Sequence, residues 1–266
     1  MSKPYLTPIP DKILVVDHIV ASNHKDVAIV FLHGLGDVLM FSSVWDYMLR
    51  SLPGVKFTLF LLSGFEPLIP GSRTWTGDAC LSGFDVAYVL EFPMSEGSGE
   101  LKSEKCARLE LGIDGPFDVD SLVLDGRRIV AVHFQATALP GACNAPEPVA
   151  RRIWEILVEK GMVPIDVHFT HCFHNPVNVL YPWAVTNVRG QPPSVEKLYS
   201  LIEAASVVVA VASGPMVMTL AINPGKLIYL ENHHKISDYT RKKVSSVKVD
   251  PFSEQEFRHR LSEKIG

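Results

Sequence analysis

One pattern constrains the fold of this chain more than any other: an apolar strand, a glycine turn, a helix and a second apolar strand follow one another with no spare residues between them. The pattern occupies residues 207–230, VVVAVASGPMVMTLAINPGKLIYL. The β-branched run at residues 207–211 is typical of a parallel strand that is covered on both faces. Residues 227–230 indicate a second buried strand. The stretch therefore predicts a parallel β-α-β unit.

The turn inside this unit favours a bound anion. Gly214 allows a ligand to approach the backbone closely, and Pro215 suits the first position of a helix over residues 216–222 because its missing N–H is not needed there. The N–H groups and the positive end of the dipole of this helix favour a ligand such as a diphosphate. An ordinary turn whose Gly and Pro only shape the chain explains the same residues, and the sequence leaves both interpretations open.

Composition excludes several classes of protein. The 266 residues are 47% hydrophobic and 20% charged, which is enough for the core of one large or two modest domains. No apolar run reaches the ~20 residues of a membrane span, so we expect a cytoplasmic protein, with peripheral membrane contact left open. A net charge of −4 without a basic face argues against a nucleic-acid partner. The four cysteines form no CxxC pair, which predicts reduced thiols.

The first sixty residues predict a second β-α-β unit. Residues 12–20 and 27–32 are strand-like runs, and the second of them leads into His33-Gly34-Leu35-Gly36-Asp37. A helical pattern follows at residues 38–52, and residues 55–62 indicate the next parallel strand.

Two α/β series follow from the rest of the pattern. We expect strands at residues 84–91, 129–134 and 163–169, helices at 102–111, 147–160 and 195–205, and a closing helix that Ser253 caps. The polar segment 113–128 is the candidate linker. The fold class is therefore α/β, with two doubly wound, Rossmann-like domains at residues 1–120 and 121–266 that face each other across a cleft.

These motifs together resemble a known family. Gly36-Asp37-Val38-Leu39, the segment from Val188 to Ala205, and Ser213-Gly214-Pro215-Met216 are similar to segments of the heptosyltransferase-like glycosyltransferases of family 9, which have the GT-B fold. Residues 130–137 and the helix after Pro146 also resemble the start of the family's donor domain.

The resemblance implies roles for individual residues. Asp37 matches the proposed general base, with Gly34 and Gly36 in the loop on the acceptor side. Ser213, Gly214, Pro215 and Met216 match the turn that binds the donor diphosphate, and Thr137 matches a small hydroxyl residue of the first donor-domain loop. The alternative for Asp37 is an N-cap of the helix that follows it.

The resemblance also implies a reaction. It is the inverting, metal-independent transfer of a hexose or heptose from a nucleotide-diphosphate sugar, an ADP-linked one among the options, to a glycan or lipid-linked glycan of the lipopolysaccharide type. No cofactor is implied beyond this donor.

The closing helix should cross back to the first domain and bury Phe257, Leu261 and Ile265 there.

Three departures from the family pattern leave another function open. Ala212 and Val217 stand where the family has Asp and His, and residues 142–146 lack the expected basic side chain. A catalytically degenerate protein that only binds nucleotide sugars is therefore the alternative.

Two further readings have less support in the sequence. Residues 31–36, FLHGLG, resemble the oxyanion loop of α/β-hydrolases, but the chain has no G-x-S-x-G nucleophile elbow. His168, His171, Cys172 and His174 have a spacing that metal ligands can have, but no carboxylate lies among them.

Overall fold

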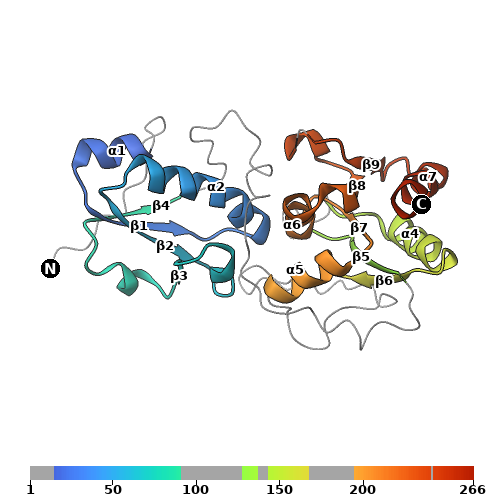
Figure 1. Cartoon of the computed structure of the whole chain (residues 1–266), viewed down its shortest axis with the longest axis horizontal. Coiled ribbons are helices and arrows are strands. Elements are labelled where there is room, and N and C mark those ends of the chain that lie inside the picture. The colour runs from blue at the N-terminus through green and yellow to red at the C-terminus, as the bar shows by residue number, and fades with distance from the viewer. Residues whose placement is uncertain (1–14, 91–127, 137–142, 168–194, 241) are drawn as a thin grey trace. The chain divides into compact units, whose positions relative to one another are not determined.

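The computed structural model describes residues 15–90, 128–136, 143–167, 195–240 and 242–266 (Figure 1). Contacts within the chain divide it into two units, residues 1–100 and 101–266. This division and the domain boundary expected at residue 120 both fall within residues 91–127, outside the described residues. The helix expected at residues 102–111 and the linker expected at residues 113–128 fall there too, apart from Arg128.

The first unit is built on a parallel sheet with the strand order β3-β2-β1-β4. Its elements are α1 (Val15–Ser22), β1 (Asp26–Phe31), α2 (Leu35–Ser51), β2 (Lys56–Leu61), η1 (Glu66–Leu68), β3 (Arg73–Thr74), η2 (Asp78–Leu81) and β4 (Val86–Val89). The β-α-β unit predicted from residues 27–62 is thus present, with β1 and β2 paired in parallel along their full length.

Aromatic side chains pack on both faces of this sheet. On one face the ring of Phe31 in β1 stacks on Phe41 of α2 with centroids 4.3 Å apart. Figure 1 shows α1 and α2 on the same side of the sheet. On the other face Phe60 of β2 meets Trp75 and Phe84 edge to face, both from the segment that includes η2. This segment covers a face that a helix covers in a regular doubly wound fold.

The strand expected at residues 12–20 is wrong over its described part, where the structure has α1. The buried residues of α1 are Val15, Val16 and Ile19, which share one face at helical spacing. His18 fixes the helix to the sheet through a 2.7 Å hydrogen bond between its Nδ1 and the hydroxyl of Tyr88. An apolar run of this length fits either element, and its packing against β4 decides for the helix.

The second unit is built on a parallel sheet with the strand order β6-β5-β7-β8-β9. Its elements are β5 (Ile129–His133), α4 (Glu147–Glu159), β6 (Val163–Asp166), α5 (Val195–Ala204), β7 (Val207–Ala210), α6 (Gly214–Ile222), η3 (Pro224–Lys226), β8 (Leu227–Glu231), η4 (Ile236–Asp238), β9 (Ser245–Lys248) and α7 (Glu254–Ile265). The pattern at residues 207–230 therefore forms the predicted strand, helix and strand.

Helices cover both faces of the second sheet. Figure 1 shows α4 and α7 on one side of the sheet and α5 and α6 on the other. Alternate residues of the strands, such as Val130, Val132 and Val209, form one core with the apolar side of α4. This is the doubly wound arrangement that continuous apolar strands indicate.

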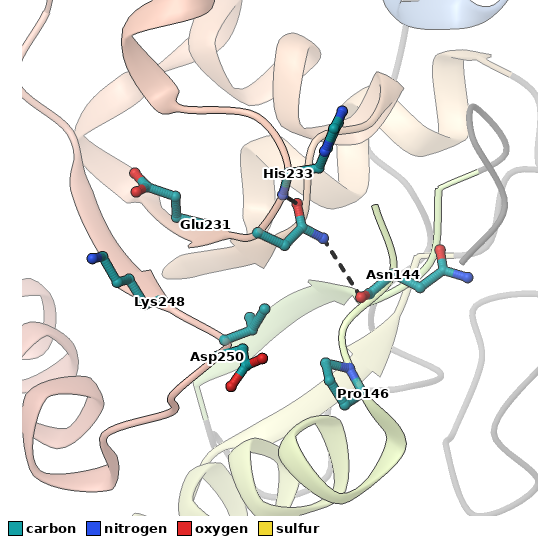
Figure 2. Close-up of a pocket in the computed structure, with 8 residues that line it drawn as sticks. Asn144, Pro146, Glu231, His233, Lys248 and Asp250 are labelled. Atoms are coloured by element: carbon teal, nitrogen blue, oxygen red, sulfur yellow. Dashed lines mark hydrogen bonds between the residues drawn. The ribbon is translucent and has the colours of Figure 1, made fainter. Parts of the chain in front are cut away.

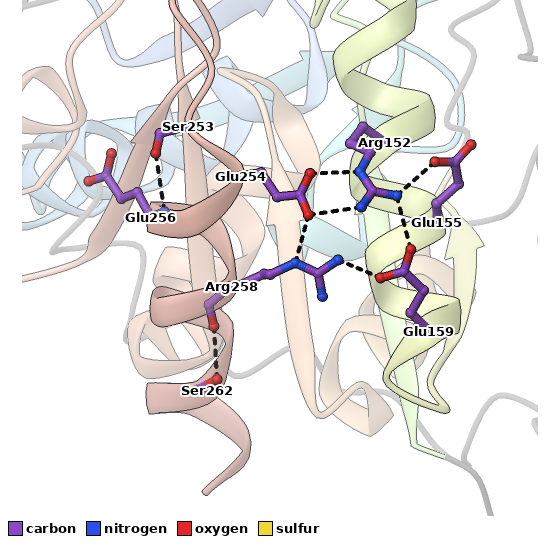
Figure 3. A network of polar contacts seen from close by, with 8 residues as sticks. All are labelled: Arg152, Glu155, Glu159, Ser253, Glu254, Glu256, Arg258 and Ser262. Carbon is purple, nitrogen blue, oxygen red and sulfur yellow. Dashed lines mark hydrogen bonds and ion pairs between the residues drawn. The ribbon is translucent and has the colours of Figure 1, made fainter.

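The closing helix α7 buries its apolar side in this same core. Phe257 and Leu261 are fully buried among residues of the second unit, and Ile265 packs against them. The sequence placed these three residues against the first domain instead. Polar contacts reinforce the observed position, since Arg152 of α4 binds both carboxylate oxygens of Glu254 at 2.8 Å (Figure 3). Ser253 caps the helix as expected, accepting a 3.2 Å hydrogen bond from Glu256 N.

Candidate functional site

The strand order of each sheet reverses at one place. In the second unit the chain goes from β5 to β6 on one side and then returns to form β7 on the other side of β5. Ligands of open parallel sheets bind at the carboxyl ends of the two strands that flank such a reversal. The turn Ser213-Gly214 follows the end of β7 after two residues, so it lies at the edge where a ligand is expected.

Ser213 shapes this turn with its own side chain. Its backbone is extended, and its hydroxyl accepts a hydrogen bond from Met216 N at 3.5 Å while donating to the carbonyl of Val211 at 2.9 Å. Val217 N donates to the Ser213 carbonyl at 3.1 Å. Ser213 is therefore the N-cap of α6, with its hydroxyl used within the turn.

The amide groups that remain for a ligand are fewer than the sequence suggested. Pro215 has no N–H, and Met216 N is taken up by the cap. The backbone N–H groups of Ser213 and Gly214 make no hydrogen bond with any described residue. These two amides, at the positive end of α6, are the groups that can hold an anion.

The residues beside the turn are apolar and buried. Ala212 is 6% exposed and Val217 is 2% exposed, so neither position offers a polar contact. Thr137 and the metal ligands considered above, His168 to His174, lie outside the described residues. Among the described residues no group of three His, Cys, Asp or Glu side chains gathers that could hold a metal ion.

The first unit has its own reversal, between β1 and β4. His33 joins the ends of these two strands, because its Nε2 lies 3.0 Å from the carbonyl oxygen of Leu90. The loop that follows starts α2, whose N-cap is Gly34 with φ −68°. Gly34, Gly36 and Asp37 were expected at this edge from the sequence, whereas His33 was given no role here. The position of His33 just after a strand was the one feature of the sequence that could have indicated this contact.

Asp37 lies in the first turn of α2 and is half-buried. The alternative that Asp37 is the N-cap is wrong, because Gly34 occupies that position. The carboxylate nevertheless turns back toward the start of the helix, since a Cβ at Gly34 would lie 3.7 Å from Asp37 Oδ2. A carboxylate there complements the helix dipole, so a structural role competes with a catalytic one.

A polar pocket of about 590 Å³ opens in the second unit (Figure 2). It is lined by Asn144, Pro146, Glu231, Asn232, His233, Lys248, Val249 and Asp250. These residues come from the ends of β8 and β9 and from the segment before α4. Of these, only Asn144 and Pro146 lie in a segment that the sequence had singled out, residues 142–146, which lack the family's basic side chain. The strand β9 was not predicted because its only buried residue is Val247, so it lacks an apolar run.

One buried carboxyl group lies near the same edge. Asp166 ends β6, is 7% exposed, and has its pKa raised to about 7 by burial.

No helix in the described part of the chain is long and apolar enough to span a membrane.

Solved structures supply the comparison, since neither a protein-family model nor a curated protein sequence matches the chain. The Escherichia coli ADP-heptose lipopolysaccharide heptosyltransferase II aligns with a TM-score of 0.62 over 90% of this chain and 98% of its own, at 12% identity. The chain has the heptosyltransferase fold.

Two further structures with this heptosyltransferase fold agree. The glycosyl transferase family 9 protein of Veillonella parvula aligns with a TM-score of 0.59 over 91% of this chain and 97% of its own, at 8% identity. The E. coli heptosyltransferase WaaC, solved with ADP, gives a TM-score of 0.54 over 90% and 98%, at 13% identity. The likeness confirms the fold that the sequence motifs implied.

Proposed function

We propose that the protein is a glycosyltransferase that moves a hexose- or heptose-type sugar from a nucleotide-diphosphate sugar to a hydroxyl group of a glycan or lipopolysaccharide-type acceptor. The reaction inverts the anomeric carbon and uses no metal. The observation that carries the proposal is the Ser213-Gly214 turn at the strand-order reversal of the second sheet, in a chain with the heptosyltransferase fold. WaaC was solved with ADP and with ADP-2-deoxy-2-fluoro heptose, so an ADP-linked donor is the first to test.

The donor diphosphate lies against the start of α6. The two amides of Ser213 and Gly214 donate hydrogen bonds to its oxygens, and the helix dipole adds a favourable field. The first turn of α6 carries no acidic side chain that would oppose this charge.

Asp37 is the base in the proposed reaction. Its carboxylate takes the proton of the acceptor hydroxyl as the oxygen attacks the anomeric carbon. A bond forms between that oxygen and the carbon, while the bond from the carbon to the diphosphate oxygen breaks. The electron pair leaves with the nucleoside diphosphate, whose growing charge the α6 amides stabilise.

A catalytically degenerate nucleotide-sugar-binding protein is the second candidate. The observation that favours it is the pair of buried apolar residues beside the turn, Ala212 and Val217. The described residues of the loop before α4, 143–146, also carry no basic side chain. Both features reduce the stabilisation of a leaving group without preventing binding.

A serine hydrolase has less support. The hydroxyl of Ser213 donates to the Val211 carbonyl, and no described histidine is hydrogen-bonded to it. An activated serine needs a base within hydrogen-bond reach.

The experiment compares ADP release from ADP-heptose, with deacylated lipopolysaccharide core as acceptor, in the parent and in Asp37→Asn. We expect a fall of ~100-fold or more in transfer with an unchanged Kd for the donor, the scale expected when a general base is lost. The control is Asp46→Asn, an exposed position on the same helix. Unchanged transfer in Asp37→Asn would show that Asp37 is not the base and only stabilises the helix. A parent that binds the donor and transfers nothing would favour the degenerate protein.

A further inference from the structure

The polar pocket of the second unit has the size and position of a ligand site. Its volume of about 590 Å³ falls in the range of about 300–1,000 Å³ that is usual for small-molecule sites. Its walls come from the carboxyl ends of β8 and β9, the same edge of the sheet that carries the Ser213 turn after β7.

Three charged side chains in the pocket have no polar partner among the described residues. Glu231 and Lys248 are partners in the register of β8 and β9, so they lie on the same face of the sheet. The side chains of Glu231, Lys248 and Asp250 make no hydrogen bond or ion pair with any residue of the described ranges. Figure 2 shows the side chains of Glu231 and Lys248 extending to the same side, with Asp250 on the segment that follows β9. Two acceptor groups and one donor group are therefore available to a ligand.

Asn232 and Asn144 hold the shape of the pocket. Asn232 accepts a hydrogen bond from His233 N at 2.7 Å and donates one from Nδ2 to the carbonyl of Asn144 at 3.5 Å. Asn144 in turn accepts a 2.8 Å hydrogen bond at Oδ1 from Ala136 N. Because Ala136 follows β5, the pocket wall is tied to the loop that leaves the sheet at the strand-order reversal.

The mixture of charges selects the class of ligand. Two carboxylates next to one ammonium group repel a phosphate, and burying an apolar group against them would leave charges without water or partners. A hydroxyl group both donates and accepts, so neighbouring hydroxyls on one ring can donate to the carboxylates and accept from Lys248. We propose that this pocket binds the hydroxyl groups of a sugar ring of the donor, either the ribose or the transferred sugar. The proposal rests on the proposed function.

Calorimetry tests this assignment of the pocket. The parent and two variants are each titrated with ADP-heptose and with ADP. Glu231→Gln keeps the size of the side chain and removes its charge, and Lys248→Met removes the ammonium group. We expect each variant to weaken the binding of ADP-heptose by about tenfold or more, the scale of a lost hydrogen bond to a charged group. The control is Glu203→Gln, the same change at an exposed residue outside the pocket, which should bind like the parent. Thermal melts of all variants establish that each is folded.

The two ligands separate the possible sources of the hydroxyls. Equal weakening for ADP and ADP-heptose assigns the pocket to the ribose, and weakening for ADP-heptose alone assigns it to the transferred sugar. Parent-like affinities in both variants overturn the pocket assignment and leave the proposed function standing. A parent that binds neither ADP-heptose nor ADP overturns the ADP-linked donor and the pocket assignment with it.

Discussion

Asp166 should make the stability of the second unit depend on pH. The group ends β6 beside Val132, whose side chain belongs to the core under α4, and burial raises its pKa from 3.8 to about 7. Between these two values the folded protein keeps a proton that the unfolded chain releases. Rising pH therefore favours unfolding, and the stability that is present at acidic pH is lost as the pH passes through about 7.

The magnitude follows from the two pKa values. At about 1.36 kcal/mol per pH unit, the whole gap corresponds to about 4 kcal/mol, of which about 2–3 kcal/mol falls between pH 5 and pH 8. Asp166→Asn removes the titration with little change in volume. Between pH 5 and pH 8 the unfolding free energy of the parent should therefore fall by about 2–3 kcal/mol more than that of the variant.

Urea denaturation at pH 5 and pH 8, followed by circular dichroism, measures this difference. Glu203→Gln, which removes an exposed carboxylate from the same unit, should follow the parent at both pH values. Asp166→Asn with the same pH dependence as the parent would refute the reasoning, because the buried carboxyl group would then not be the one that titrates.

The other predictions concern the helices of the second unit. Hydrogen bonds from Arg152, and to a smaller extent from Arg258, lower the pKa of Glu254 to about 2 (Figure 3). These contacts therefore stabilise the fold above pH 4.5, and their contribution is lost as the pH falls toward 2. Glu254→Gln should lose less stability than the parent on acidification in thermal melts, and high salt should shrink the difference between them. Ser253→Ala removes the cap of α7 and should lower the unfolding free energy by about 1 kcal/mol in urea, whereas Ser253→Asp, which can still cap, should restore it.

The sequence predicted most of the elements because their apolar patterns match their burial. The strand at residues 207–211 was expected as wholly buried, and β7 is buried at every position. The helix α4 was expected within one residue of its observed end at Glu159. The strand-like run before residue 20 failed because only its packing against Tyr88 distinguishes a helix from a strand.

The site was less predictable, because it depends on contacts between distant segments. The turn at Ser213 was found from its own residues, yet only the structure reveals that the cap uses its hydroxyl and the amide of Met216. The pocket went unnoticed because its residues are distant in the sequence: Asn144 and Lys248, for example, are 104 positions apart. The role of α7 was misjudged because its apolar residues fit any complementary surface, and the ion pairs with α4 are not visible in a sequence pattern.

The most direct test of the central claim is the affinity of Gly214→Val for ADP-heptose, measured by calorimetry beside the parent and Gly54→Val. We expect a valine side chain at Gly214 to block the approach of the diphosphate to the amides of the turn, so binding should be lost while the protein stays folded. Gly54 has nothing within 4 Å of an added Cβ, and the same substitution there should leave the affinity unchanged. A folded Gly214→Val variant that binds ADP-heptose as tightly as the parent would contradict the placement of the donor at this turn.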